Sequence, residues 1–188
     1  AVKRGVRECF GNVGQSCNAP TRMLVQRSIY DAVVEKAAEV AEATRVDRSD
    51  KSGKNLGPLV SDIQWNKVQG LIQKGIDEGA RLVAGGPGRP AGLNSGYFAR
   101  PTVFANVSND MAIAQEEIFG PVLSIIPFED EAEAIEIAND TPYGLTNYVQ
   151  TGDPARARRM ARALNSGMVE VNGEGLGFDT PFGGVKNS

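Results

Sequence analysis

Cys17 is the residue whose type and setting best suit covalent chemistry. It lies in a polar, glycine-containing turn, Gly-Gln-Ser-Cys-Asn, that ends shortly before Pro20. A thiol with an ordinary pKa of about 8.5 is mostly protonated at neutral pH, so a catalytic cysteine needs a base, a dipole or a cation beside it. The chain contains no histidine, so Glu, Lys, backbone amides or a group outside the chain must activate the thiol. The alternative interpretation is a small buried apolar side chain.

The composition describes a globular protein. Its 188 residues, 41% of them hydrophobic and 23% charged, suffice for one domain or a large part of a bigger protein. A net charge of −3 gives no field that would collect nucleic acid. With two cysteines and no histidine we expect no disulfide framework and no metal site. No apolar run reaches the length of a membrane span and the first residues lack a signal-peptide core, so we expect a cytoplasmic protein without membrane partners.

Alternating strand and helix patterns must position the cysteine turn. Strands are predicted at 21–26, 81–84, 99–104, 122–128, 145–150 and 168–172, and helices at 29–46, 62–79, 129–139 and 154–164, besides the end of a helix within 2–13. Ser28 is expected to cap the first long helix, and Ser61 or Asp62 the second. The pattern predicts the α/β class, a mostly parallel sheet with flanking helices, in which loops at the carboxyl ends of strands build the site.

Four short motifs follow one another along the chain. They are Gly14-Gln-Ser-Cys17, Glu116-Glu-Ile-Phe-Gly-Pro-Val122, Pro142-Tyr-Gly-Leu145 and Pro181-Phe-Gly-Gly-Val-Lys186. Together they resemble the catalytic domain of the aldehyde dehydrogenase superfamily, from about residue 5 to the end. The resemblance implies that residues 1–188 form one such catalytic domain. It also implies oxidation of an aldehyde to a carboxylic acid with NAD or NADP, through a thiohemiacetal and a thioester on Cys17.

The resemblance assigns cofactor contacts to four residues. In the family, the residue matching Glu117 hydrogen-bonds the nicotinamide-side ribose, and the one matching Phe119 packs at that end of the cofactor. If the segment is extended, alternation puts these two side chains on one face; the alternative is an exposed carboxylate beside a packed ring. Gln64 and Lys67 occupy places where family members approach the sugar or adenine half, although a solvated helix face is the alternative.

The same resemblance suggests an aldehyde pocket. Ser16 and Asn18, which flank the thiol, and the aromatic Phe182 are expected to line it. The loop 173–179 combines three glycines with apolar residues, among them Phe178, which suggests a rim for apolar aldehydes. The alternative is that the glycines satisfy a tight surface turn.

Several parts of such an enzyme have no match in this chain. The cofactor-binding domain, the general base, the second oxyanion donor and the strand exchanged between subunits are expected outside it. We therefore expect an excised fragment without turnover, taken from a homodimer or homotetramer. Two rival classes remain: a non-catalytic relative of the same fold, and a member of the superfamily that acylates coenzyme A or reduces an acyl phosphate.

Overall fold

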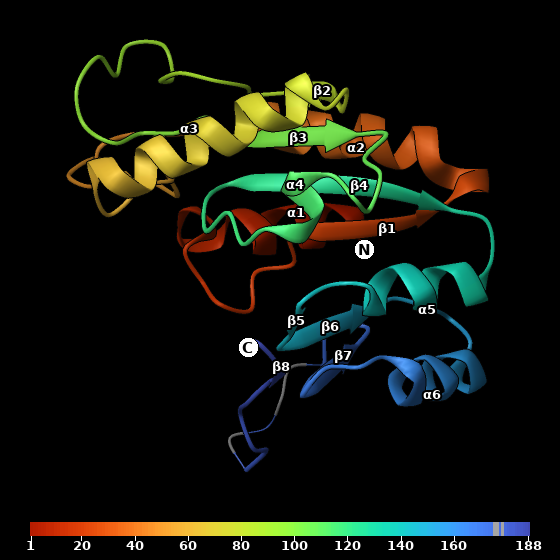
Figure 1. The fold of residues 1–188 in the computed structure, drawn as a ribbon. Helices are drawn as coiled ribbons and strands as arrows, with labels where there is room; N and C mark the ends of the chain where they lie inside the picture. Colours follow the sequence, from red (N-terminus) through yellow and green to blue (C-terminus); the bar gives the residue numbers. More distant parts are fainter. Residues whose placement is uncertain (175–176, 178) are drawn as a thin grey trace. The chain divides into compact units, whose positions relative to one another are not determined.

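The computed structural model describes residues 1–174, 177 and 179–188, and the chain forms two compact units (Figure 1). The larger unit comprises residues 2–127, and the smaller one comprises 128–188 together with Ala1. Helices alternate with strands in both, which confirms the predicted α/β class. Among the residues described, none of the helices combines the length and the apolar character needed to cross a membrane.

The larger unit is built on a sheet with helices around it. Its helices are α1 (Val2–Phe10), α2 (Tyr30–Glu42), α3 (Asp62–Asp77) and α4 (Ala112–Gln115), with two 3-10 turns, η1 (Gly11–Gly14) and η2 (Arg27–Ile29). Its strands are β1 (Arg22–Gln26), β2 (Arg81–Ala84), β3 (Thr102–Ala105) and β4 (Val122–Phe128). They lie in the order β1-β4-β3-β2, with β3 parallel to β4 and β2 antiparallel to β3.

Helices cover both faces of this sheet. Val103 and Ala105 of β3 belong to the core that α1 and α2 form on one face. Phe104, between them, points to the other face, where its ring approaches Gly75 of α3: a methyl group built on Gly75 would lie 3.3 Å from the ring. The first five residues of β4 are all buried, as expected of a central strand covered on both sides. The sheet is thus the rigid base from which the loops of the site emerge.

Three boundaries of two predicted elements differ from the structure for identifiable reasons. Ser28 does not cap α2, because the chain first makes the turn η2 and the helix begins at Tyr30. That helix ends at Glu42 rather than near Val46, which instead bridges to Leu56. Strand β3 begins only after Pro101, whose nitrogen has no hydrogen to donate.

The start of α3 agrees with the sequence prediction. Ser61 is its N-cap, and its hydroxyl oxygen accepts a hydrogen bond from the backbone N–H of Gln64 over 3.2 Å. This cap fixes the first turn of the helix, which contains Gln64, a residue that contacts the loop before β4.

The smaller unit contains a strand-helix-strand arrangement and a short strand pair. Its elements are α5 (Glu131–Asn139), β5 (Tyr143–Gly144), β6 (Thr146–Val149), α6 (Pro154–Ala163), β7 (Met168–Val171) and β8 (Val185–Lys186). Strands β6 and β7 are parallel, and β5 pairs with β8 in antiparallel fashion. The Lys186 ammonium donates to the carbonyl oxygens of Asn139 and Thr141, at 2.6 and 2.9 Å, where the carbonyl end of α5 favours a cation. The third and fourth motifs therefore lie side by side.

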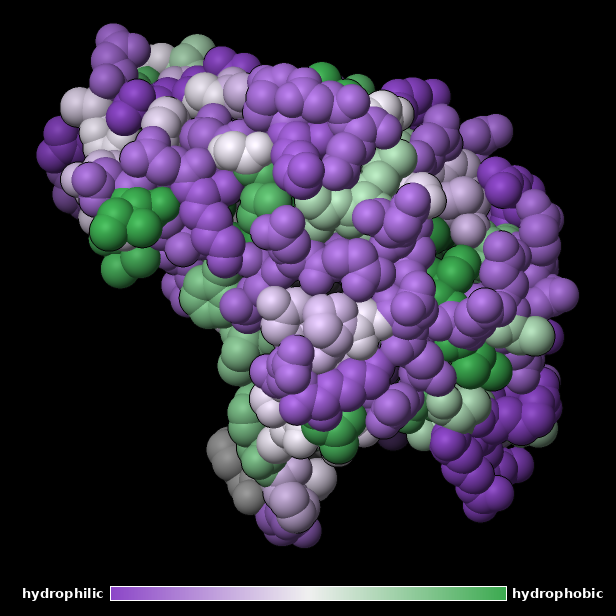
Figure 2. Space-filling view, viewed as in Figure 1, coloured by the Kyte–Doolittle hydropathy of each residue, from purple (hydrophilic) through white to green (hydrophobic). Residues whose placement is uncertain are grey.

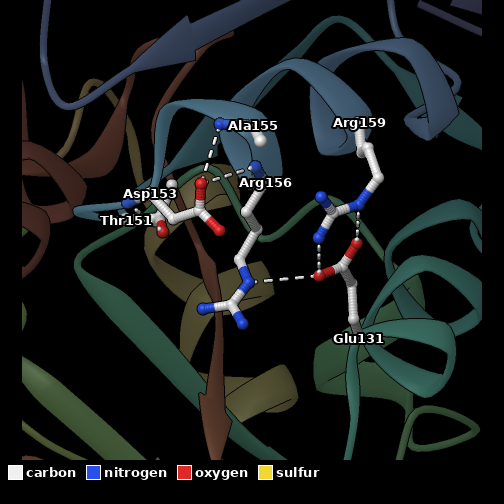
Figure 3. Close-up of polar contacts among 6 residues, drawn as sticks. All are labelled: Glu131, Thr151, Asp153, Ala155, Arg156 and Arg159. Atoms are coloured by element: carbon white, nitrogen blue, oxygen red, sulfur yellow. Dashed lines mark hydrogen bonds and ion pairs between the residues drawn. The ribbon is translucent and has the colours of Figure 1, made fainter.

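Ionic contacts join α5 to α6 (Figure 3). Arg159 meets the Glu131 carboxylate with two hydrogen bonds, at 3.1 and 3.0 Å, and Arg156 adds a third at 3.1 Å. The hydrogen bonds from Arg159, followed by those from Arg156, lower the pKa of Glu131. Asp153 caps α6 by accepting from the N–H groups of Ala155 and Arg156. Two of the arginines on α6 thus hold the helix pair together.

Glu131→Gln is expected to weaken the α5–α6 contact in a pH-dependent way. Since the folded state lowers the pKa of Glu131, the contribution is complete above the unfolded pKa of about 4.3 and is lost as the pH falls through the folded pKa. At pH 7 the variant should exchange backbone amides of 129–164 faster than wild type, and near pH 3 the difference should shrink. Glu136→Gln, an exposed change on the same helix, is the control; equal behaviour of both variants would contradict the assignment.

Candidate active site

Cys17 lies at the centre of a tight turn between η1 and β1. The backbone N–H of Ala19 donates to the carbonyl oxygen of Ser16 over 3.0 Å, which puts Cys17 and Asn18 at the two central positions. Both central side chains are exposed, and Ser16 is half-buried. The alternative of a buried apolar cysteine is therefore wrong for Cys17, whose side chain is exposed in this chain.

Cys9, the other cysteine, lies in the core, whereas Cys17 is at the surface. Its side chain is 0% exposed, and its Sγ lies 3.5 Å from the carbonyl oxygen of Val122. Burial raises the pKa of the Cys9 thiol to about 12. The thiolate is then almost absent at neutral pH, so Cys9 is a structural residue of the core.

Gly14 brings the loop of Cys17 against the loop before β4. Its φ of +70° is in the left-handed region, and a methyl group built on it would lie 2.0 Å from the carbonyl oxygen of Gly120. Gly120 approaches α3 in the same way, since a methyl group there would lie 2.5 Å from Val68. The segment 14–21, which carries Cys17 and is called the cysteine loop, is therefore in direct contact with the loop 116–121. That loop in turn contacts α3.

The loop 116–121 is not fully extended, which corrects the predicted alternation. Phe119 has a φ of +55°, an unusual conformation for a bulky side chain. Glu116 and Glu117 are both exposed, Ile118 is buried and Phe119 is half-buried. The Glu117 carboxylate is therefore at the surface, two residues before a partly accessible ring.

The segment from Val60 to Gln64, where α3 begins, contacts both loops. The side-chain amide nitrogen of Gln64 donates to the carbonyl oxygens of Ile118 and Phe119, each over 2.9 Å. The amide oxygen of Gln15, in the cysteine loop, accepts from the backbone N–H of Val60 over 2.9 Å. Lys67 is exposed one turn further along the helix. Of the predicted cofactor residues, Gln64 thus contacts the 116–121 loop directly, by hydrogen bonds from its own side chain.

Gln15 is a residue that the sequence analysis missed. Its position inside the Gly-Gln-Ser-Cys motif was the available signal. Its partner Val60 is 45 positions away in the sequence, so the contact itself was not accessible from local pattern.

These loops lie at the amino ends of their strands, not at the carboxyl ends expected for the fold class. The turn at Cys17 leads into β1 and the loop 116–121 leads into β4, and these strands are neighbours in the sheet. The candidate site is thus formed by connections that enter the sheet from a helix.

Exposed apolar side chains border the site where α3 begins. Val60 and Ile63 are 79% and 78% exposed. Figure 2 shows a mainly hydrophilic face with a hydrophobic area near the start of α3, which lies at the left in Figure 1. This side of the site therefore has an apolar surface next to the hydrogen bond between Gln15 and Val60.

The remaining predicted residues belong to the smaller unit. Phe182 is 66% exposed, and the adjacent Gly183 is so close to Gly167 that a methyl group on the latter would lie 1.9 Å from the Gly183 carbonyl oxygen. Phe178 lies outside the described residues. The pocket roles of Phe182 and Phe178 stay predictions.

Native thiol labelling should modify one cysteine. Because Cys17 is exposed and Cys9 is buried with a raised pKa, a disulfide reagent such as DTNB should titrate one thiol per chain before unfolding and two after it. Cys17→Ser should abolish the native reaction, whereas fast labelling that survives this substitution would contradict the exposure assignment.

Gly14→Ala should disturb the site through the backbone. The added methyl group would meet the Gly120 carbonyl, and alanine would have to adopt the left-handed backbone of this position, so we expect a loss of about 1–3 kcal/mol in the free energy of unfolding. Gly11→Ala is the matched control, since nothing lies within 4 Å of the position of its methyl group. Denaturant unfolding of both variants tests this; equal stabilities would refute the close approach.

Known proteins match this chain over its whole length. The sequence model of the aldehyde dehydrogenase family matches residues 1–188. The 3-succinoylsemialdehyde-pyridine dehydrogenase of a Pseudomonas species is 53% identical over all of this chain and 39% of that protein. The aldehyde dehydrogenase of Bartonella henselae has a similar structure, with a TM-score of 0.97 and 57% identity over 98% of this chain and 39% of that chain.

A third relative was solved with small molecules bound. It is a mutant of aldehyde dehydrogenase C from Pseudomonas syringae in complex with NAD+ and octanal, with a TM-score of 0.96 and 46% identity over 99% of this chain and 38% of that chain. The chain thus spans only 39% of the length of the 3-succinoylsemialdehyde-pyridine dehydrogenase. With a family match over its entire length, the chain belongs to the aldehyde dehydrogenase family.

Proposed function

We propose that Cys17 is the nucleophile with which the longer protein oxidises an aldehyde to a carboxylic acid, using NAD+ or NADP+. The observation that carries this proposal is the exposed thiol at a turn whose loop packs, through Gly14, directly on the loop of Phe119 and Gly120. The Pseudomonas syringae relative binds NAD+ and octanal, which supports NAD+ as the cofactor and an aldehyde as the substrate.

Residues of the loop 116–121, which contacts the loop of Cys17 through Gly14 and Gly120, fit the nicotinamide end of such a cofactor. The exposed Glu117 carboxylate has two oxygens that can accept from both hydroxyls of a ribose. The half-buried Phe119 ring offers an apolar surface without a competing polar group. Lys67 is an exposed cation on α3. When bound, NAD(P)+ supplies the oxidant that takes a hydride from the substrate carbon.

The chemistry of this chain is centred on the Cys17 sulfur. The thiolate adds to the aldehyde carbon, forming a C–S bond and an oxyanion that the Cys17 backbone N–H helps to hold. After oxidation the carbon is a thioester, and attack by water breaks the C–S bond to release the acid and restore the thiol. We propose that Ser16 and Asn18, which flank Cys17 in the turn, contact the substrate.

The base that accepts the protons is assigned to a part of the protein outside this chain. Glu8 is the acidic residue before Cys17, and it lies on α1 in an ion pair with Arg4 at 3.1 Å. A paired carboxylate on another element is poorly suited to activate water at the turn. We therefore infer that the chain alone lacks turnover. By the family resemblance, we infer a homodimer or homotetramer for the whole protein. A cytoplasmic location remains our inference from its two cysteines, which are too few for a disulfide framework.

Cys17→Ala in the intact protein should abolish aldehyde-dependent reduction of NAD(P)+, because no other group forms the thioester. The assay follows NADH or NADPH absorbance with a panel of aldehydes that includes octanal, and acid formation confirms the product. Loss of at least about 1,000-fold in kcat/KM is expected when a covalent nucleophile is removed. The control is Cys9→Ala, a core change that should leave activity in the folded enzyme.

Three outcomes would overturn parts of this assignment. Unchanged activity of Cys17→Ala would exclude it as the nucleophile. Acyl-coenzyme A as the product, when coenzyme A is present, would place the protein in the acylating class instead. Steady-state turnover by the 188-residue chain alone would refute the inference about the missing base.

A further inference from the structure

The amide of Gln64 holds two successive carbonyl groups of the 116–121 loop. Both of its N–H groups are used, since the nitrogen lies 2.9 Å from the carbonyl oxygens of Ile118 and Phe119. In an extended strand successive carbonyls point in opposite directions, so one amide could not reach both. The left-handed φ of +55° at Phe119 turns them to the same side. The Gln64 contact and the unusual backbone of Phe119 therefore depend on each other.

The amide of Gln15 connects the cysteine loop to the segment before α3. Its oxygen accepts from the backbone N–H of Val60 at 2.9 Å, and its nitrogen donates to the carbonyl oxygen of Asn12 at 3.3 Å. Asn12 returns a hydrogen bond from its side-chain amide to the Gln15 carbonyl oxygen at 2.9 Å. Gln15 thus joins the turn before Cys17 to the residue that precedes the N-cap of α3.

The two amides converge on one short segment. Val60 and Gln64 stand on either side of the Ser61 cap, within five positions. The contact of Gly14 with Gly120 joins the two loops on their other side. The result is a closed ring of contacts: cysteine loop to the start of α3, α3 to the 116–121 loop, and that loop back to the cysteine loop.

We propose that Gln64 is a positioning residue that holds Phe119 and Glu117 in place for the cofactor, and that Gln15 does the same for Cys17. The first turn of α3 then sets the distance between the nucleophile and the cofactor end of the site. The catalytic consequence rests on the proposed function, but the positioning itself is a property of the folded chain. Gln64 acts through the loop rather than by direct contact with the nicotinamide end.

Hydrogen exchange on the cofactor-free intact protein tests the positioning. Gln64→Met keeps the length of the side chain but removes both donors, so amides of 116–122 should exchange on the order of 10-fold faster. Amides of β3 should stay as in wild type. In turnover, kcat should fall on the order of 10-fold while the KM for the aldehyde changes little, since the misplaced group is at the cofactor.

Matched variants separate this role from others. Gln73→Met removes an exposed amide on the same helix, bonded to Asp77 at 2.8 Å, and should change neither exchange at 116–122 nor turnover. Gln15→Met should alter the rate of Cys17 alkylation but leave the exchange of 116–122 near wild type. If Gln64→Met does not fold, Gln64→Glu serves instead, because it keeps the shape and also removes the donors.

The outcomes distinguish this proposal from the proposed function. Normal exchange at 116–122 in Gln64→Met, together with a raised Kd for NAD+, would make Gln64 a direct ligand and overturn the positioning role, with the function intact. Faster exchange throughout the protein would mean a general loss of stability and would also overturn it. If the wild-type protein oxidises no aldehyde, the function fails, yet local loosening of 116–122 in Gln64→Met would still support the contact.

Discussion

The approach of two glycine backbones, Gly14 and Gly120, is the constraint on which the candidate site depends. A single methyl group on Gly14 would fall 2.0 Å from the Gly120 carbonyl oxygen, so no other residue type fits that conformation without moving a loop. The contact joins the segments that lead into the neighbouring strands β1 and β4, and the buried strand β4 gives them a base that cannot shift freely. Cys17 lies three residues from one glycine and Phe119 is adjacent to the other. The positions of both candidate site residues therefore depend on one backbone contact.

Local patterns predicted most elements, and the errors arose where tertiary contacts decide the outcome. Ser28 has the type of an N-cap, but α2 begins at Tyr30, whose buried hydroxyl donates to Ile125 and accepts from the N–H of Asn106. That fixed tyrosine selects the helix start over the preceding serine. Strands β5 and β8 have two residues each, too few to show an alternating pattern. They exist because motifs about 40 residues apart in the chain pair with each other.

Those parts of the site that depend on local turn residues could be predicted from the sequence. Those that depend on contacts between distant segments could not. The polar, glycine-containing stretch around Cys17 indicated a loop, and the thiol is exposed in a turn. The alternation rule failed at Phe119 because it assumes an extended backbone. This residue is left-handed instead, and its own carbonyl and that of Ile118 both accept from Gln64. Such a conformation in a bulky residue is favourable only with a partner from elsewhere in the fold, and its signal is absent from a window of local sequence.

The absence of histidine now has a physical consequence for the proposed mechanism. With Glu8 held by Arg4 on α1, the proton chemistry is assigned to the rest of the longer protein, while this chain holds the sulfur and the cofactor end. Proton transfer tolerates such a division, because a water molecule can bridge base and substrate. Hydride transfer does not, because it needs the reacting carbon and the cofactor within close contact and in a fixed orientation. In the proposed mechanism, Cys17 and Phe119 lie on loops that share one glycine contact within a single compact unit, an arrangement suited to the stricter of these two requirements.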